Sequence, residues 1–156
     1  MRKWLALALV VIVLDQASKQ AILASLAYGE RLAVIPGFFN LTLAYNPGAA
    51  FSFLADAGGW QRHFFTALAL GVSAGIVYML KKHLAESRFC LQLSLILGGA
   101  IGNVIDRILY GHVVDFIQIH YQSWYYPAFN IADSAICIGV GLMLFDGFFE
   151  RKKEPA

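Results

Sequence analysis

The chain has 156 residues, of which 59% are hydrophobic and only 14% are charged, with a formal net charge of +2. Its mean hydropathy of +0.63 excludes an ordinary soluble domain. The net charge decides little by itself, and we expect no nucleic-acid partner. The length leaves room for a single membrane domain, residues 1–156, with about four spans of roughly 20 residues each.

Residues 4–26 form the first apolar segment, and Arg2 and Lys3 precede it. A basic start before an apolar run resembles a secretory signal peptide, but the apolar character resumes after a short polar stretch and three more spans follow. We therefore predict a transmembrane helix over residues 4–26. Within it, Asp15 and Lys19 stand four residues apart, so they lie on one helical face and can form an ion pair with a structural role.

Residues 27–61 form a long connection that begins with a predicted β-hairpin. Residues 31–35 are β-prone, and residues 39–45 alternate between apolar and small or polar side chains. Pro36-Gly37 between them fits the central pair of a type II turn. We expect this hairpin to lie on the membrane surface.

The second predicted helix contains Gly71-Val-Ser-Ala-Gly75, a formal match to the Gly-x-Ser-x-Gly nucleophile elbow. An elbow needs a strand before it and a helix after it, whereas this motif lies in the middle of one apolar helix. We therefore assign Ser73 to packing. Gly71 with Gly75, and Gly98 with Gly102, are each spaced as a small-residue face for helix packing.

Cys90 and Cys137 each lie inside an apolar segment. The predicted topology places them near opposite faces of the membrane, farther apart than the roughly 7 Å between Cα atoms that a disulfide allows. We predict that both are small core residues.

The four predicted helices span about residues 4–26, 62–80, 89–109 and 130–149. The lysines and arginines that flank them fall on one side: Arg2, Lys3, Lys81, Lys82, Arg88, Arg151, Lys152 and Lys153. By the positive-inside rule that side is cytoplasmic, so both termini are cytoplasmic. The outer loops are then residues 27–61 and 110–129.

Three carboxylates lie at the outer ends of the apolar segments, where an ionisable group is by default a functional hypothesis. Asp106 adjoins Arg107, which favours a local ion pair or a hydrogen-bonding role. Asp115 interrupts an extended apolar run and has no basic neighbour. Asp133 opens the fourth helix one turn after Asn130, as in a capping box. Two carboxylates held together can share one proton, so that one activates water and the other polarises a carbonyl.

The motifs that carry chemistry occur in a fixed order: Asp15-x-x-x-Lys19, Asn46-x-Gly48-Ala-Ala-Phe51, Gly102-Asn103-x-x-Asp106-Arg107, Val114-Asp115-Phe116 and Phe129-Asn130-x-Ala132-Asp133. Together they resemble the motif set of the signal peptidase II family. The resemblance covers nearly the whole chain, and it is specific because all five motifs occur together on four predicted helices.

The resemblance implies an aspartic endopeptidase of the bacterial cytoplasmic (inner) membrane. It also implies a small extracytoplasmic β-cradle on the membrane surface, which agrees with the predicted hairpin. The predicted topology places the active site on the outer side. Such an enzyme removes signal peptides from diacylglyceryl-modified prolipoproteins and cuts just before the lipidated cysteine. Carried over by motif, Asp115 and Asp133 match the catalytic pair. The residues that match the lining and support of the site are Asn46, Gly48, Asn103, Asp106, Arg107 and Asn130, with Asp15 and Lys19 beneath it. The partners implied are the lipidated substrate and membrane lipid. We expect a monomer without cofactor or metal.

A small transporter or proton-conducting protein is the alternative, because it could also place Asp15, Lys19, Asp106 and Arg107 in the membrane. Such a protein needs polar residues across the full depth, yet the second helix and the inner half of the fourth offer almost none.

A metal-dependent hydrolase could draw on His112, Asp115 and His120. These residues do not have the His-x-x-x-His spacing of a helical zinc site. Insensitivity of the activity to chelators would separate the peptidase from this class.

Overall fold

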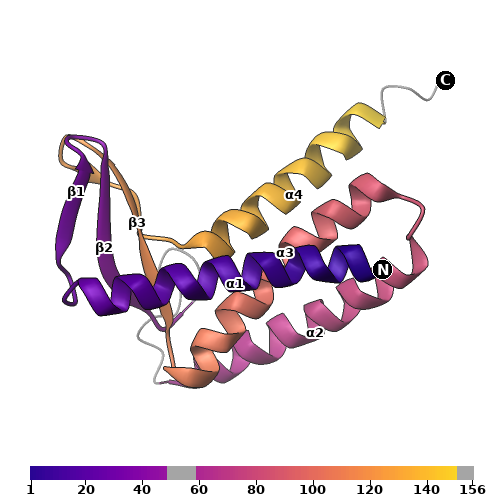
Figure 1. Ribbon diagram of the computed structural model, residues 1–156, viewed down its shortest axis with the longest axis horizontal. Helices are drawn as coiled ribbons and strands as arrows, with labels where there is room; N and C mark the ends of the chain where they lie inside the picture. Colours follow the sequence, from indigo (N-terminus) through magenta and orange to yellow (C-terminus); the bar gives the residue numbers. More distant parts are fainter. Residues whose placement is uncertain (49–58, 151–156) are drawn as a thin grey trace.

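The computed structural model describes residues 1–48 and 59–150, and within them four long helices and a four-stranded sheet (Figure 1). The helices are α1 (Arg2–Ser25), α2 (Trp60–Lys82), α3 (Ser87–Leu109) and α4 (Ile131–Glu150). The strands are β1 (Arg31–Ile35), β2 (Phe39–Asn46), β3 (Val113–Tyr121) and β4 (Trp124–Tyr125). Phe51 and the basic residues 151–153 lie outside the described residues.

Each of the four helices in the described residues is long and apolar enough to span a membrane, which confirms the predicted helical membrane architecture with four spans. In the most apolar part of α3, 67% of residues are buried, against 17% in α2 and 17% in α4. The third helix is therefore the centre of the bundle. The outer faces of α2 and α4 remain exposed and apolar, as lipid-facing surfaces must be.

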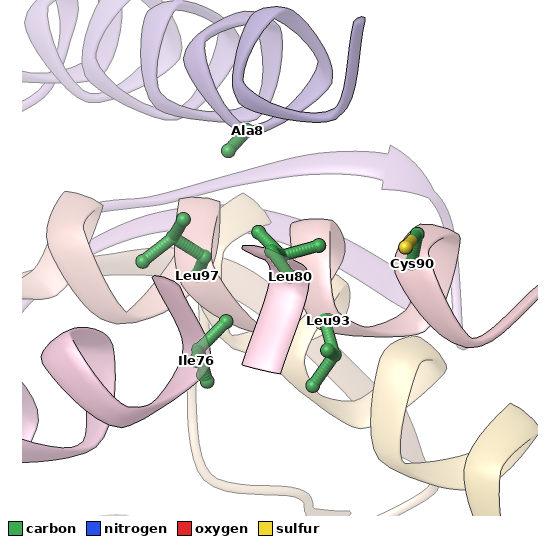
Figure 2. Packing of buried hydrophobic residues seen from close by; sticks show 6 residues of the cluster. All are labelled: Ala8, Ile76, Leu80, Cys90, Leu93 and Leu97. Atoms are coloured by element: carbon green, nitrogen blue, oxygen red, sulfur yellow. The ribbon is translucent and has the colours of Figure 1, made fainter. Parts of the chain in front are cut away.

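One hydrophobic cluster joins the first three helices at the end of the bundle that holds the N-terminus (Figures 1 and 2). It is formed by Ala8 of α1, Ile76 and Leu80 of α2, and Cys90, Leu93 and Leu97 of α3 (Figure 2). Leu80 and Cys90 are fully buried. This cluster fixes the helices at the end of the bundle opposite the sheet.

The glycines behave differently in α3 and α2. A Cβ atom on Gly98 would lie 2.7 Å from Val11 Cβ, and one on Gly102 would lie 2.7 Å from Asp15 Oδ2. Close packing of α1 on α3 therefore requires glycine at both positions, as predicted. Apart from the adjoining residues and nearby backbone of α2 itself, no described atom lies within 4 Å of a Cβ atom built on Gly71 or Gly75. The packing role predicted for that pair is wrong for the described chain.

The strands form one antiparallel sheet in the order β1-β2-β3-β4, which stands at one end of the helices (Figure 1). The predicted hairpin is confirmed: Phe38 donates its backbone N–H to the Ile35 carbonyl at 3.0 Å, and Gly37 has φ +80°. A type II turn requires this positive φ, which favours glycine. The long strand β3, which pairs with β2 of the hairpin, was not predicted.

At the end of the bundle away from the sheet, Asp146 of α4 ties two polar residues of α3. Its Oδ2 atom lies 2.6 Å from Arg88 Nε and accepts a hydrogen bond from Gln92 Nε2 at 2.6 Å. Because Asp146 belongs to α4 and both of its partners belong to α3, these contacts join the two helices.

Candidate active site

Asp115 and Asp133 come from separate elements and line the same cavity, which has a volume of about 670 Å³. Asp115 lies on β3, opposite Ala44 of β2, and Asp133 lies in the first turn of α4. The remaining wall is largely apolar and comes from α2, α3, α4 and residues 126–129. The cavity therefore presents two carboxylates to an apolar space.

The wall formed by residues 126–129 is a continuation of the sheet. The Phe129 carbonyl accepts the Ile117 N–H at 2.8 Å, and the Phe129 N–H donates to the Ile117 carbonyl at 3.0 Å. Tyr126 donates its N–H to the Ile119 carbonyl at 2.9 Å. Because β3 carries Asp115 as well, one strand sets both a carboxylate and the wall beside it.

Asn130 connects the two carboxylates. Its Nδ2 atom donates to Asp115 Oδ1 at 2.8 Å, while its Oδ1 atom accepts the Asp133 backbone N–H at 2.8 Å. The second contact is the predicted N-cap of α4, which is therefore confirmed. The same amide fixes one carboxylate through its donor and the backbone of the other through its acceptor. Asn130 therefore caps α4 and positions the two carboxylates at the same time.

Neutral amides supply the remaining donors to the pair. Asn103 Nδ2 donates to Asp133 Oδ1 at 2.7 Å, and Asn46 makes a side-chain hydrogen bond to Asp115. In the described chain neither carboxylate has a lysine or arginine within ion-pair distance. The pair is therefore oriented by dipoles and is not neutralised by a cation of its own.

Asp115 is buried, with 3% of its surface exposed. Burial and the nearby negative charge of Asp133 raise the pKa of Asp115 to about 7, against the hydrogen bonds from Asn46 and Asn130 and the charge of Lys19. A carboxyl group with this pKa can hold a proton near neutral pH. Because the two carboxyl groups interact, a measured pKa describes the pair and not either residue alone.

A second set of charges lies beneath the pair and is fully buried. Lys19 Nζ lies 2.8 Å from Asp15 Oδ2 and 2.8 Å from Asp106 Oδ2, and it donates to Asn103 Oδ1 at 3.2 Å. The predicted ion pair of Asp15 with Lys19 is confirmed. All three charged side chains are within 1% of complete burial. Such burial requires the mutual pairing that is observed.

The ion pair expected between Asp106 and its neighbour Arg107 is not found among the described residues. Asp106 instead pairs with Lys19 and accepts the backbone N–H of Val114 at 3.0 Å. Adjacent residues of a helix point about 100° apart, so their side chains do not meet. Asp106 faces α1 and β3, and Arg107 faces the cavity.

Arg107 binds backbone carbonyls. Its Nη2 atom donates to the Gly48 carbonyl at 3.0 Å, and its Nη1 atom donates to the Asn103 carbonyl at 3.3 Å. Asn46 Oδ1 accepts the Gly48 N–H at 3.0 Å. Gly48 is therefore held at both its amide and its carbonyl, which fixes the chain where β2 ends at the cavity. These contacts bring the predicted residues Asn46, Gly48 and Arg107 together at one edge.

Gln16 also lies in this region, although it was not predicted to be a site residue. Its Nε2 atom donates to Asp106 Oδ1 at 2.8 Å and lies 3.2 Å from both Asp15 Oδ2 and the Gly102 carbonyl. The available signal was its position inside an apolar segment, beside one member of the Asp15–Lys19 pair. The motif spacing alone did not single it out.

Two other sequence features fall elsewhere. Ser73 is buried in the middle of α2, and its hydroxyl has no hydrogen-bond partner in the described part of the chain. It therefore lacks the base that a serine nucleophile needs. Cys90 is buried as predicted, but Cys137 is exposed and lines the cavity, so the core position predicted for it is wrong.

Across residues 1–48 and 59–150, no group of three or more histidine, cysteine or acidic side chains is placed to hold a metal ion. His112 contacts aromatic rings, with its ring centroid 4.1 Å from that of Tyr45. His120 stacks on Tyr125 at 4.8 Å. The donors that a metal-dependent hydrolase would use therefore pack separately.

The fold and the site define a class: a multi-pass membrane protein with two carboxylates, buried Asp115 and half-buried Asp133, in one cavity at the sheet end of its helices. A family model described as signal peptidase (SPase) II matches residues 7–149. The chain therefore belongs to the signal peptidase II family, and it is an aspartic peptidase of that type.

Relatives agree over almost the whole length. The chain is 58% identical over 146 residues to a lipoprotein signal peptidase of Janthinobacterium sp. (strain Marseille), covering 94% of this chain and 88% of that protein. It is 58% identical over 143 residues to one of Ralstonia nicotianae, covering 92% and 82%. A solved bacterial membrane enzyme, determined by the in meso method at 2.3 Å, matches with a TM-score of 0.89 at 33% identity, covering 100% of this chain and 94% of the other.

Proposed function

We propose that this protein removes the signal peptide from diacylglyceryl-modified prolipoproteins, cutting just before the lipidated cysteine. The observation that carries the proposal is the convergence of Asp115 and Asp133 on one apolar cavity, oriented by the amides of Asn130, Asn103 and Asn46. The names of the relatives support the substrate class. The apolar wall suits a substrate that carries acyl chains and an apolar signal segment.

In the proposed mechanism the pair holds one proton at neutral pH. The ionised carboxylate accepts a proton from a water molecule, and the water oxygen attacks the carbonyl carbon of the scissile peptide bond. The protonated carboxyl group donates a hydrogen bond to the carbonyl oxygen, which stabilises the negative charge that develops there. The proton taken from water then passes to the leaving amine, so that the pair ends with one proton again.

The roles of the remaining predicted residues follow from their contacts. Asn130 and Asn103 hold the carboxylates, and Arg107 with Asn46 holds Gly48 at the edge of the cavity. Asp15, Lys19 and Asp106 lie beneath the site. The reaction needs neither metal nor cofactor, and the site lies within one chain, so we propose a monomer.

The direct test is cleavage by the purified protein in detergent of a lipidated precursor and its unlipidated twin, with the products identified by mass spectrometry. We expect a cut immediately before the lipidated cysteine, and at least tenfold slower cleavage of the twin. Equal rates on both substrates would contradict the substrate class. Cleavage elsewhere would contradict the proposed position of the cut.

We also propose that the sheet and the cavity face the outer side of the bacterial inner membrane. The start of α1 and the end of α2 lie at the end of the bundle away from the sheet (Figure 1). Lys3 belongs to the first of these helix ends, and Lys81 and Lys82 belong to the second, which supports this orientation by the positive-inside rule. After replacement of the two native cysteines, a cysteine at Ser123 should react with an impermeant maleimide in intact spheroplasts. One at Lys82 should react only after lysis, and the reverse pattern would contradict this orientation.

A further inference from the structure

Lys19 joins two carboxylates, and each of these also binds the backbone beside one member of the pair. Asp15 Oδ1 accepts the Ala132 N–H at 2.9 Å, and Asp106 Oδ2 accepts the Val114 N–H at 3.0 Å. The ammonium group lies 2.8 Å from each carboxylate. Lys19 is therefore linked through Asp15 to the start of α4 and through Asp106 to the start of β3. We call these two links the arms of Lys19.

The arms end one residue before each proposed catalytic carboxylate. Ala132 precedes Asp133, and Val114 precedes Asp115. Both alanine and valine here are fully buried, so these backbone amides cannot exchange their partners for water. A displacement of either arm would move the adjacent carboxylate with it.

Gln16 links the same two arms through a neutral group. Its amide nitrogen lies 2.8 Å from Asp106 Oδ1 and 3.2 Å from Asp15 Oδ2. Lys19 therefore supplies the charge between the arms, and Gln16 supplies the only other link between them among the described residues that uses a side-chain donor.

We propose that Lys19 and Gln16 are positioning residues for the cleavage reaction. By holding Asp15 and Asp106 together they set the separation of Asp115 and Asp133. The inference rests on the proposed function, because it takes these two carboxylates as the reacting pair. The proposal gives Lys19 and Gln16 a role in the chemical step, although neither side chain contacts Asp115 or Asp133. Reaction geometry tolerates little error, and a displacement of about 1 Å can lower a rate roughly 100-fold.

Gln16→Leu is the most informative variant, because it removes the donor without changing any charge. Its matched control is Gln20→Leu, one helical turn later, since Gln20 donates to the hydroxyl of Tyr110 at 2.8 Å on the exposed surface. We expect Gln16→Leu to lower kcat by about 10- to 100-fold with KM changed less than about twofold. Gln20→Leu should change neither constant by more than about twofold.

The pH dependence of kcat distinguishes positioning from a purely structural role. Two like charges interact less as they separate, so the two pKa values of the pair should move closer together. The plateau of the pH–rate profile should then be narrower in Gln16→Leu than in the wild type. The charges that face the pair, from Lys19, Asp15, Asp106 and Arg107, are the same in both proteins. A purely structural role would lower thermal stability and leave kcat per folded enzyme and the profile unchanged.

Asp115→Asn, measured in parallel, separates this proposal from the proposed function. If Asp115→Asn is inactive while Gln16→Leu matches Gln20→Leu in kcat and in its pH profile, the positioning role is wrong and the catalytic pair stands. If Asp115→Asn still cleaves, the pair itself is wrong and the positioning role fails with it. A low kcat and a narrowed profile confined to Gln16→Leu would support the inference.

Discussion

Two pairs of carboxylates lie close together at the sheet end of the helices, and their surroundings differ. Asp15 and Asp106 have a lysine between them and are fully buried. Asp115 and Asp133 have only neutral amides as partners in the described residues, and they line a cavity. The first pair is neutralised in place, which suits a structural role. The second keeps an unbalanced charge where a substrate can enter, and this is where carboxylate chemistry is possible.

The largest expected effect on the cleavage rate comes from replacing Asp115 or Asp133, the two carboxylates that line the cavity. Asp115→Asn and Asp133→Asn should each lower kcat at least roughly 1,000-fold, because an amide cannot accept the proton of the water. The double variant should be little worse than either single one, since the two residues act as a unit. Cleavage of the lipidated precursor measures the rate, and thermal unfolding in detergent measures the stability.

Stability should not fall in these variants, because an amide avoids the cost of burying a second charge. Substantial cleavage by either variant would contradict the assignment of catalysis to Asp115 and Asp133 and of a structural role to Asp15 and Asp106. Asp106 would then be the next carboxylate to test.

The opposite outcome is expected for the buried pair. Lys19→Met leaves Asp15 and Asp106 without their shared cation, so the protein should lose about 3–5 kcal/mol of stability. Asp106→Asn keeps one ion pair, Asp15 with Lys19, and should cost less, about 1–3 kcal/mol. Thermal unfolding in detergent checks both values. Unchanged stability of Lys19→Met would show that the buried charges are not what holds this end of the bundle together.

The pH dependence of the rate sharpens the comparison further. In the proposed mechanism the pair needs one proton, and the raised pKa of Asp115, about 7, sets where that proton would be lost. We therefore expect kcat/KM to fall above about pH 7, by about tenfold per pH unit once the proton is gone. A rate that stays level to pH 9 would contradict a shared proton.

The same pKa predicts the pH dependence of stability. In the unfolded chain Asp115 loses its proton near pH 3.8, whereas the folded protein keeps it until about pH 7. The folded state binds more protons in that interval, so stability should fall as pH rises from about 4 to about 7. Asp115→Asn should lack this component, which a comparison of unfolding temperatures across that interval can test.

The smallest expected effects lie in α2. Ser73→Ala should leave kcat and KM within about twofold of the wild type, because Ser73 packs inside a helix and has no base beside it in the described chain. Gly71→Ala should be equally mild, since no described atom beyond the nearby residues of α2 lies within 4 Å of the new methyl group. Complete loss of activity in Ser73→Ala, with normal membrane insertion, would revive a serine mechanism.

Periodicity and charge placement in the sequence were sufficient for the membrane class, the helices and the hairpin. Apolar runs of about 20 residues have few alternatives to a spanning helix, and Pro36-Gly37 specifies its turn locally. The N-cap at Asn130 and the pair of Asp15 with Lys19 were also predicted, because each depends on contacts three or four residues apart. Charge placement in an apolar chain singled out Asp106, Asp115 and Asp133. Resemblance to a family supplied Asn46, Gly48 and Asn103, which no periodicity could select.

Tertiary structure alone decided which charges meet. Sequence adjacency favoured a pairing of Asp106 with Arg107, yet Asp106 meets Lys19, 87 positions earlier, and Arg107 meets the carbonyl of Gly48. The approach of α1 to α3 over Gly98 and Gly102 makes the first contact possible, and nothing in the local sequence distinguishes these glycines from Gly71 and Gly75. Local patterns fix elements because the relevant interactions are short in sequence. Partners across elements depend on packing, which is settled only when the helices and the sheet come together.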